Sequence, residues 1–513
     1  MRRFAVTKMS TGVAALAVLT SVALLSGCAS DAPGTQSRDL TIALAVEPVS
    51  LDPCDTQDAA NAVVLRSNVT ESLTRIDPSS GEVVPVLAES WEQKNDSTWT
   101  FHLREGVTFQ DGTAMDADAV VSSISRVVDP ELNCQNLDQF PNSLVITAVD
   151  PLTVDITSSA PDSILPLRIS YADIAAASTP ADEKTSEPIG TGPYAFDSRE
   201  QGTSVKLVRY DGYWGDAPEA ASVTYVYRAE PSVRAGMATT GEASIATAIS
   251  AQDATDDDRT REYNDNRVFF LRTPTDRAPF DDVRVRQAAQ LAIDKATIVG
   301  ALMERSGVPA DQIVVSTVNG YVDGYEAPAF DLEEAKALLA EAEADGVAVD
   351  TAFDLVSRPD LFPGADEVIQ AIHQNLSDAG FNVNILSLDT DAWLQLLRAP
   401  FPADQKPSVI AISHDNVSGD ATFTFPKYIG SEGANSTISN PEIDTLLAEA
   451  ELAVGDERAA LFAQAARVEY EEVGAYIPIA LQSKLIKLAA GIEYQPNGLT
   501  GVELRVSDIT FTN

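Results

Sequence analysis

The pattern of hydrophobic and polar residues predicts β-strands through the first half of the chain. β-Branched and aromatic residues concentrate in five segments, at residues 40–46, 99–109, 204–210, 222–228 and 267–272. A similar pattern over residues 146–159 is interrupted by Asp150 and Pro151, which is typical of a hairpin turn. The first half is therefore expected to be rich in β-structure.

Helical periodicity dominates after about residue 280. Three amphipathic segments carry cap residues at their ends, at residues 331–345, 365–379 and 442–454. Asp331 and Glu334 stand at the spacing of a capping box, and Gly380 stops the second helix. Two predicted strands alternate with these helices, at residues 381–388 and 408–413. We expect residues 280–490 to form an α/β lobe.

The first residues are expected to be an export signal. An apolar run from Thr11 to Leu25 follows a basic start and ends in Leu-Ser-Gly-Cys28, the order found in bacterial lipoprotein signals. This run is shorter than the roughly 20 apolar residues that a membrane-spanning helix needs. We expect residues 1–27 to be a cleaved signal peptide, Cys28 to be lipidated, and residues 28–37 to form a flexible stalk. The alternative is an ordinary secretory peptide with an incidental Cys.

Composition and charge exclude several kinds of function. The 513 residues include 35 Lys or Arg and 77 Asp or Glu, a formal net charge of −42. Nucleic acid is excluded as a partner because phosphate binding requires a basic surface. Anionic lipids would repel the protein, so the lipid anchor is expected to be its only attachment to the membrane. Three Cys and three His are too few for a zinc framework or an iron–sulfur cluster, so no metal and no cofactor is expected.

Export places Cys54 and Cys134 in an oxidising compartment, where an isolated pair of cysteines tends to be bridged. We expect one disulfide between them. It would close a loop of about 80 residues and contribute up to roughly 4 kcal/mol in the chain-entropy model. Two separate buried thiols are the alternative.

No motif of a common hydrolase and no P-loop is present. The sequence lacks G-x-S-x-G, S-x-x-K, H-E-x-x-H and G-x-x-x-x-G-K-[ST]. His102 and His373 lie within predicted elements and are expected to be surface or core residues. His414 is different because it follows the apolar strand 408–413, where α/β lobes present ligand-binding groups. We expect no catalytic residues, and a binding role or a simple polar turn at His414.

Seven motifs in order resemble one family over nearly the whole chain. They lie at residues 45–53, 68–73, 84–91, 99–113, 188–194, 210–215 and 279–288. Together they resemble the cluster C (family 5) extracytoplasmic solute-binding proteins of ABC importers. The same residues also have structural explanations: Gly190 and Gly192 would permit positive φ, and Asp281 would cap a helix that extends to Ile298.

The resemblance implies an α/β, periplasmic-binding-protein-like fold of type II, with two hinged lobes, an extra domain and a ligand cleft between the lobes. The implied division has three domains. Domain I takes residues 38–54, 180–275 and 492–513, domain II takes residues 55–179, and domain III takes residues 276–491. Closure around a ligand requires that the closed form bind it more tightly than the open form.

The resemblance also implies a function without catalysis. The protein would be a monomeric, lipid-anchored receptor on the extracytoplasmic face of the bacterial cell membrane. It would capture a small solute or peptide and deliver it to the transmembrane subunits of an ABC permease. A cell-surface hydrolase that uses carboxylates and a permease-coupled sensor of a protein ligand are the alternatives.

Two candidate site residues come from the peptide-binding members of the family. Trp393 holds the position of a Trp that lines their pocket, and Asp415 holds the position of an acid that pairs with the amino group of the ligand. A core aromatic and a polar cap are the structural alternatives. Near Asp415 those relatives carry an aromatic residue, whereas this chain has the polar His414 and Asn416.

Three further candidates surround the expected cleft. Arg272 could offer a planar fork to a carboxylate or a phosphate, with a surface ion pair as the alternative. Gln57 and Asp58 follow Cys54 at the border of the cleft. The disulfide is therefore expected to stiffen one wall of the site.

Overall fold

The computed structural model describes residues 38–513 apart from residues 79, 255–257, 360, 403, 417, 497, 499–502 and 513. Residues 38–513 form one compact unit. The predicted signal peptide, Cys28 and the stalk lie outside the described residues. Within the described part, no helix combines the length and the apolar character needed to cross a bilayer.

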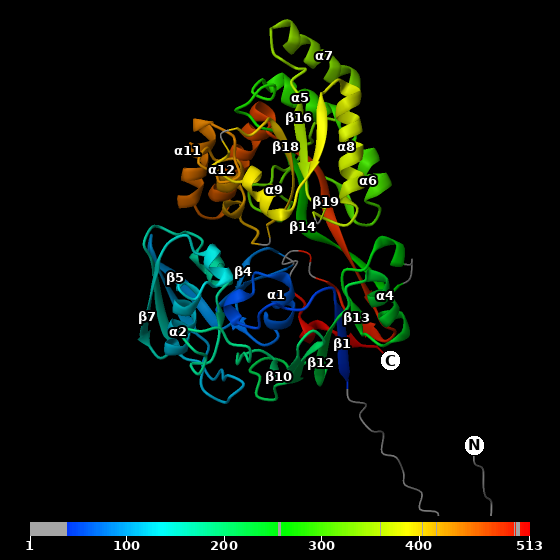
Figure 1. Cartoon of the computed structure of the whole chain (residues 1–513). Coiled ribbons are helices and arrows are strands. Elements are labelled where there is room, and N and C mark those ends of the chain that lie inside the picture. The colour runs from blue at the N-terminus through cyan, green and yellow to red at the C-terminus, as the bar shows by residue number, and fades with distance from the viewer. Residues whose placement is uncertain are drawn as a thin grey trace, which may run out of the picture. The chain divides into compact units, whose positions relative to one another are not determined.

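One large sheet contains strands from both halves of the described chain (Figure 1). Its strands are hydrogen-bonded in the order β10 (Tyr194–Glu200), β11 (Ser204–Arg209), β12 (Ser222–Tyr227), β1 (Asp39–Leu44), β13 (Ile245–Ala246), β19 (Tyr476–Leu488), β14 (Thr260–Arg272), β18 (Ser408–Asp415), β16 (Phe353–Ser357) and β17 (Val383–Ser387). The short strand β15 (Gly307–Pro309) also pairs with β19. The strands predicted at 40–46, 204–210, 222–228, 381–388 and 408–413 are confirmed, with small shifts at their ends.

The long strands β14 and β19 connect the two halves of this sheet (Figure 1). β13 pairs with one end of β19, and β18 pairs with the opposite end of β14. Between Asn264 and Val268 the register of β14 against β19 shifts, and Asn266 there adopts a left-handed backbone with φ 53°. Such a bulge increases local twist and interrupts the ladder. The sequence predicts only residues 267–272 of β14 and misses β19.

A separate antiparallel sheet holds the predicted hairpin. Its order is β5 (Ala88–Asn95), β6 (Thr98–Leu103), β8 (Thr153–Ser158) and β7 (Leu144–Asp150), and α2 (Ala117–Val127) packs on it. The hairpin β7–β8 confirms the turn at Asp150 and Pro151. The strand predicted over 99–109 ends earlier, at Leu103, because the chain turns at Gly106 with φ 80°.

Helices cover both faces of the half of the large sheet that contains β16 and β18. One face carries α5 (Val283–Ala292), α6 (Lys295–Leu302), α7 (Leu332–Ala344) and α8 (Ala365–Ala379). The other face carries α9 (Thr390–Leu397), α10 (Phe425–Tyr428), α11 (Pro441–Leu452) and α12 (Gly455–Val468). Phe269 faces the first group and Phe270 the second, as alternating side chains of a strand do. The α/β arrangement predicted for residues 280–490 is thus confirmed.

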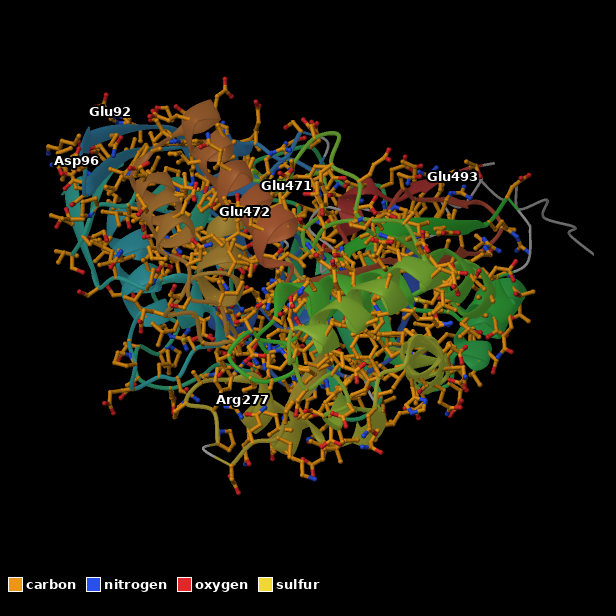
Figure 2. The ribbon with its side chains drawn as sticks, turned by 90° about the horizontal axis from the view of Figure 1, so that it is seen from above. Glu92, Asp96, Arg277, Glu471, Glu472 and Glu493 are labelled. Carbon is orange, nitrogen blue, oxygen red and sulfur yellow. A yellow bond between two sulfur atoms is a disulfide. The ribbon has the colours of Figure 1, made fainter. Side chains whose placement is uncertain are left out.

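The shorter elements complete the described fold. The helices are η1 (Pro53–Asp55), α1 (Ala59–Leu65), η2 (Gln135–Gln139), α3 (Leu165–Ile169), α4 (Pro231–Thr240), η3 (Ala251–Asp253), η4 (Ala421–Phe423), η5 (Glu469–Val473) and η6 (Val506–Asp508). The strands are β2 (Glu71–Ser72), β3 (Thr74–Ile76), β4 (Val83–Pro85), β9 (Asp173–Ile174), β20 (Ile492–Glu493) and β21 (Thr510–Phe511). Acidic side chains such as Glu92, Glu471, Glu472 and Glu493 lie at the surface (Figure 2).

The predicted helix ends agree closely with the structure in three of four cases. α8 has the predicted bounds, and Gly380 ends it with φ 108°. Asp331 caps α7, since its Oδ1 accepts from the backbone N–H of Glu334 at 3.0 Å. The prediction for Asp281 is wrong: Asp282 is the cap, and the single helix expected there is divided into α5 and α6. α12 was not predicted from the sequence.

Gly190 and Gly192 serve close packing, and the positive φ predicted for them is wrong. A Cβ atom at Gly190 would stand 2.1 Å from the carbonyl oxygen of Val69, and one at Gly192 would stand 2.5 Å from that of Asn68. The side chain of Gln110 stabilises this contact by hydrogen bonds to both segments. It accepts from the N–H of Gly190 at 2.6 Å and donates to the carbonyls of Val69 and Gly192 at 2.8 and 3.1 Å. The sequence motifs at residues 68–73, 99–113 and 188–194 therefore contact one another.

A buried carboxyl, that of Glu71, holds further motif residues together. Its oxygens accept from Thr191 Oγ1, Tyr213 Oη and Trp214 Nε1 at 2.9, 2.9 and 2.8 Å. Burial raises the pKa of Glu71 from 4.5 to about 7, although the three donors oppose the shift. The folded protein therefore holds a proton here at pH values where the unfolded chain does not.

The proton on Glu71 predicts a pH dependence of stability. Below pH 4.5 both states are protonated, and above about pH 7 both are ionised. Between these values stability falls as the pH rises, because the folded state must give up a proton that the unfolded state has already lost. Denaturant titrations at several pH values measure the free energy of unfolding. Between pH 5 and pH 7.5 we expect it to fall by about 1–3 kcal/mol less for Glu71→Gln than for the wild type.

The exposed Glu92 of β5 provides the matched control for this measurement. Glu92→Gln removes the same charge from the same part of the chain and should keep the wild-type pH slope. Equal slopes for the wild type and Glu71→Gln would contradict the buried-proton explanation.

Candidate functional site

A cavity of about 510 Å³ lies between two separate parts of the chain. Its first wall comes from residues 56–171 and includes Thr56, Gln57, Arg66, Asp138, Arg168 and Tyr171. Its second wall comes from residues 414–451 and includes His414, Asp415, Asn416, Phe423, Lys427 and Glu451. The volume falls in the range of roughly 300–1,000 Å³ that is typical of small-molecule sites. Four of the predicted site residues, Gln57, His414, Asp415 and Asn416, line this cavity.

Asp415 is a charged group at the end of β18 and belongs to a chain of ion pairs. Its Oδ2 contacts the guanidinium of Arg267, and Arg267 Nε lies 3.6 Å from Asp265 Oδ2. Lys484 Nζ lies 2.6 Å from the other oxygen of Asp265. Burial opposes ionisation of Asp415, yet the positive charges of Arg267 and Lys484 outweigh it and hold its pKa below the ordinary value. The cavity therefore contains a carboxylate at neutral pH.

His414 and Asn416 are polar residues, and their side chains stabilise the local structure through hydrogen bonds. Burial lowers the pKa of His414 to about 4, so its imidazole is neutral at pH 7. Its Nε2 lies 2.9 Å from Thr424 Oγ1. Asn416 is 4% exposed, and its Nδ2 donates to the carbonyl of Asp420 at 2.8 Å and to Thr424 Oγ1 at 3.0 Å. These bonds hold the turn after β18 against η4.

The structure places Trp393, which is predicted to line the cleft, in the hydrophobic core. The indole is 5% exposed, and its Nε1 donates to the carbonyl of Ala411 at 3.1 Å. The guanidinium of Arg358 lies 4.8 Å from the ring centroid and covers it. α9 turns this Trp toward β18, so the core-aromatic alternative describes its place.

Arg272 and Asp58 also lie outside the lining of the cavity. Arg272 is 2% exposed, and its guanidinium donates to the carbonyls of Leu397 and Asn435 at 2.8 and 2.7 Å. It therefore joins the C-terminal end of α9 to the loop that contains Asn435. Asp58 caps α1, because its Oδ1 accepts from the backbone N–H of Ala60 at 3.0 Å.

The lining residues that sequence reasoning misses include Arg66, Arg168, Tyr171, Phe423 and Lys427. They come from segments with no shared motif, and only the fold brings them together. Cations are scarce in this acidic chain, but the sequence alone does not place any of them in the cleft.

Several contacts join the two walls. The guanidinium of Arg168 lies 5.2 Å from the ring centroid of Phe423, and the ring of Tyr171 lies 6.3 Å from it. Ser163 Oγ donates to the carbonyl of Glu451 at 3.0 Å and accepts from Arg458 Nη1 at 3.2 Å. Both walls are thus held in contact beside the cavity.

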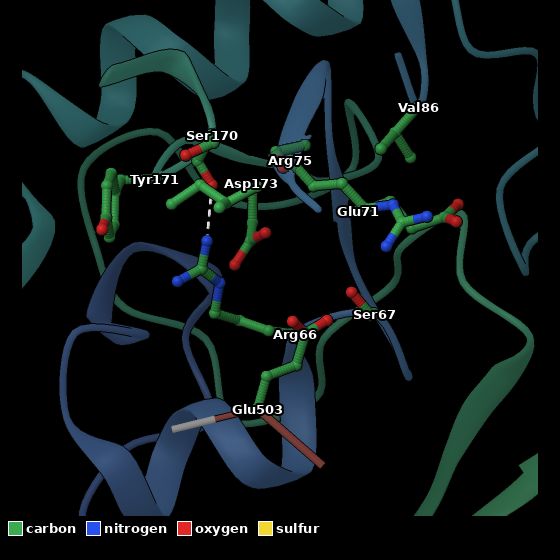
Figure 3. Close-up of a pocket in the computed structure, with 11 residues that line it drawn as sticks. Arg66, Ser67, Glu71, Arg75, Val86, Ser170, Tyr171, Asp173 and Glu503 are labelled. Carbon is green, nitrogen blue, oxygen red and sulfur yellow. Dashed lines mark hydrogen bonds between the residues drawn. The ribbon is translucent and has the colours of Figure 1, made fainter. Parts of the chain in front are cut away.

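Two neighbouring pockets share residues with this cavity. A larger cavity of about 980 Å³ also has Ser418 in its lining and contains the buried pair Asp420 and Arg458. A small pocket of about 20 Å³, with room for about one water, shares Arg66 and Tyr171 (Figure 3). There Arg66 Nη2 donates to the carbonyl of Ser170 at 2.6 Å, and its guanidinium lies 5.0 Å from the Tyr171 ring.

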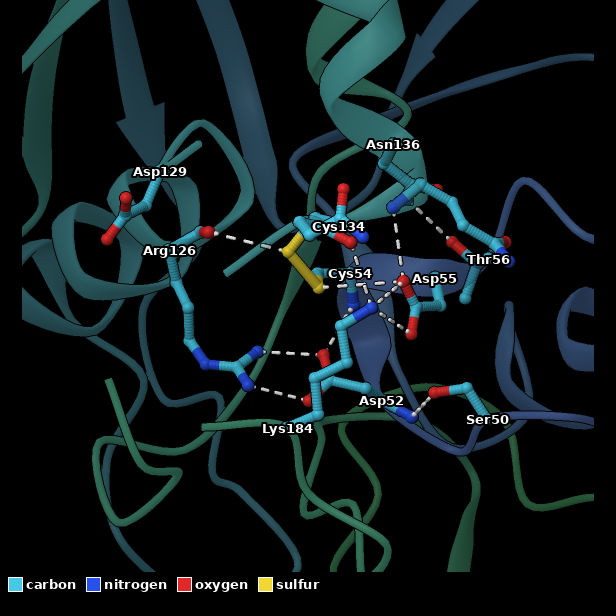
Figure 4. Close-up of a disulfide and its surroundings, with 12 residues drawn as sticks. Ser50, Asp52, Cys54, Asp55, Thr56, Arg126, Asp129, Cys134, Asn136 and Lys184 are labelled. Atoms are coloured by element: carbon cyan, nitrogen blue, oxygen red, sulfur yellow. Dashed lines mark hydrogen bonds and ion pairs between the residues drawn. A yellow bond between two sulfur atoms is a disulfide. The ribbon is translucent and has the colours of Figure 1, made fainter. Parts of the chain in front are cut away.

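The predicted disulfide between Cys54 and Cys134 is confirmed (Figure 4). It joins η1 to η2, and beside it Asp55 accepts from Lys184 Nζ at 2.7 Å. The neighbouring Asp52 is fully buried, and Arg126 binds both its oxygens at 2.8 and 2.6 Å. Thr56, Gln57 and Asp138 follow these fixed points closely along the chain. The described residues contain no group of three or more His, Cys, Asp or Glu arranged to hold a metal ion.

Comparisons with known proteins agree with the geometry. The model of the middle region of the bacterial extracellular solute-binding proteins, family 5, matches residues 82–426. The chain is 28% identical over 497 residues to the glutathione-binding protein GsiB of Escherichia coli (strain K12), which covers 92% of this chain and 93% of GsiB.

Solved structures are similar over almost the whole chain. HbpA2 from Haemophilus parasuis superimposes with a TM-score of 0.81 at 21% identity, over 93% of this chain and 100% of that one. The periplasmic binding protein DppA from Helicobacter pylori, in complex with peptide STSA, does so with a TM-score of 0.72 at 20% identity, over 92% and 98%. This similarity confirms the predicted α/β fold class.

Proposed function

The chain belongs to family 5 of the bacterial extracellular solute-binding proteins, and from this premise we propose that it binds a small peptide-like solute in the 510 Å³ cavity and delivers it to an ABC permease. The observation that carries the proposal is the ionised Asp415 in the lining of a cavity of small-molecule size. A carboxylate in a partly dry site can accept a charge-assisted hydrogen bond from a solute ammonium group.

The geometry of Asp415 leaves room for such a group. Its Oδ2 is engaged by Arg267, whereas its Oδ1 makes no hydrogen bond or ion pair with a side chain of the described residues. A relative named for glutathione, which is a tripeptide, supports a peptide-like solute. The polar surroundings of Asp415, with neutral His414 in place of a large aromatic group, favour a compact and polar solute over an apolar one.

We further propose how the cavity opens and where the protein is held. The bulge of β14 near Asn266 stands where the two long strands cross from one half of the sheet to the other, so it is our candidate for a hinge between the proposed domains. The lipoprotein pattern that ends in Cys28 supports a lipid anchor at the extracytoplasmic face of the membrane. An unmodified Cys28 thiol on protein isolated from its host would contradict the anchor.

The binding proposal predicts a specific loss in Asp415→Asn. Glutathione and short peptides should raise the melting temperature of the wild type by mass action and be recovered unchanged. A charged hydrogen bond contributes about 1.5–3 kcal/mol, so the variant should bind them at least about tenfold more weakly in calorimetry. Asp366→Asn, at the exposed start of α8, is the control and should bind as the wild type does.

The outcomes separate the possible functions. A wild type that no peptide stabilises would refute the proposed solute class. Hydrolysed peptide after incubation would instead favour the carboxylate enzyme.

A further inference from the structure

The 980 Å³ cavity lies beside the 510 Å³ cavity, and Ser418 is the one described residue that lines both. The larger cavity lies between residues 80–167 and residues 316–467. Its lining includes charged side chains that are exposed, such as those of Asp456 and Arg467, so this cavity opens to solvent. The length of solute that the smaller cavity admits therefore depends on what separates the two.

An apolar contact separates the two cavities. Phe423 lines the 510 Å³ cavity and packs against the buried cluster formed by Ile76 and Leu167. Val83 and Ile164 pack against the same cluster, and together with Leu167 they line the 980 Å³ cavity. Phe423 is contributed by the second wall, whereas the other four residues belong to the first half of the chain. A single layer of apolar side chains thus stands between the two spaces.

A polar contact divides the same space at a second point. Ser163 lines the larger cavity and Glu451 lines the smaller one. Ser163 Oγ donates to the carbonyl of Glu451 at 3.0 Å and accepts from Arg458 Nη1 at 3.2 Å. The apolar layer and this hydrogen bond together form a partition between the cavities.

The aromatic ring of the partition is held in place. Phe423 ends η4, which Asp420 caps by accepting from the backbone N–H of Thr422 at 2.9 Å. The guanidinium of Arg168 lies 5.2 Å from the centroid of the Phe423 ring, and the ring of Tyr171 lies 6.3 Å from it. Because packed side chains leave little free volume around them, a solute cannot displace this ring without disturbing its neighbours.

We infer that Phe423 is a specificity-determining residue, which closes one end of the 510 Å³ cavity and limits the length of the solute. The inference rests on the proposed function and adds a size limit to it. A fully extended tripeptide spans at most about 11 Å, and a hexapeptide at most about 22 Å. The longer peptide would have to displace the ring or remain partly outside the cavity. A steric clash of this kind discriminates against one ligand as an attractive contact favours another.

The test compares peptides of one composition and two lengths. The probes are trialanine and hexaalanine, and their affinities are measured by calorimetry on the purified protein. We expect the wild type to bind trialanine at least about tenfold more tightly than hexaalanine. Phe423→Ala removes the ring and joins the two cavities, so it should bind hexaalanine at least about tenfold more tightly than the wild type does.

Leu167→Ala tests the partition from the opposite side. It thins the same apolar layer from the first wall, so it should also raise the affinity for hexaalanine. Circular dichroism establishes that each variant is folded, and Leu167→Ala decides the question if Phe423→Ala does not fold.

Phe330→Ala is the matched control. It removes the same ring from a position that is 46% exposed and lies outside both linings, and it should keep the wild-type preference. A wild type that binds both peptides equally would overturn the inference and leave the proposed function standing. Folded variants at Phe423 and Leu167 that bind hexaalanine no better than the wild type would do the same. If neither peptide binds the wild type, both the inference and the proposed function fail.

Discussion

Asp420→Ala is expected to lower the free energy of unfolding by about 3–5 kcal/mol. Asp420 and Arg458 form a buried pair, with side chains that are 5% and 3% exposed. Arg458 Nε donates to Asp420 Oδ2 at 2.8 Å, and Arg458 Nη2 donates to Asp420 Oδ1 at 2.9 Å. Removing the carboxylate leaves a guanidinium in the interior without its counter-charge, which is more costly than the loss of an exposed pair. Chemical denaturation followed by circular dichroism measures the change.

The contribution of the pair itself is separated by a double-mutant cycle. Asp420 also accepts from the backbone N–H of Thr422 at 2.9 Å and from Asn319 Nδ2 at 2.7 Å, so the single variant loses more than one interaction. Asp420→Ala combined with Arg458→Met should cost clearly less than the sum of the two single changes, because no unpaired charge is then left buried. Asp323→Ala, an exposed acid in the lining of the same 980 Å³ cavity, should change stability by less than about 0.5 kcal/mol. Additive single effects would refute the coupling.

Loss of the disulfide is the second change with a large expected effect. Cys54 and Cys134 are 80 residues apart in sequence, and the bridge restricts the unfolded chain over that length. Cys54→Ser together with Cys134→Ser should lower the free energy of unfolding by about 2–5 kcal/mol. The peptide affinity should also fall, because Gln57 and Asp138 of the first wall lie only a few residues from the bridge. Thermal unfolding and calorimetry measure the two effects.

A reductant provides the control for the disulfide. Dithiothreitol should lower the melting temperature of the wild type toward that of the double variant. The double variant should show no response to it, because within the described residues it has no disulfide left to reduce. A wild type with the same melting temperature in both conditions would show that the bridge contributes little to stability.

The local sequence is enough to predict elements whose signals lie within a few residues. α8 combines an amphipathic period with a terminal Gly380, and both act at short range, so its predicted bounds are confirmed. The hairpin β7–β8 likewise depends on a turn at Asp150 and Pro151. His414 could be predicted to border the cavity for a related reason, because a polar residue directly after an apolar strand stands at the edge of the sheet.

Side-chain roles that depend on distant partners could not be predicted in this way. Trp393 has the same local sequence whether it faces solvent or the core, and only the packing of α9 on β18 turns it inward. Arg272 has many acids available in sequence but finds backbone carbonyls in the fold. β19 was missed although it is central, because its pairing partners β13 and β14 come from far earlier in the chain.

By itself the sequence determines several elements, the periodic faces that they bury and the family motifs, because these rest on spacing along one chain. The bridge between Cys54 and Cys134 is predicted instead from export to an oxidising compartment. Only the tertiary structure decides that residues 56–171 and 414–451 enclose one cavity and that Asp415 forms an ion pair with Arg267. The physical reason is that burial and electrostatic partnership depend on distances in space, and segments separated by more than two hundred residues acquire these distances only when the chain folds.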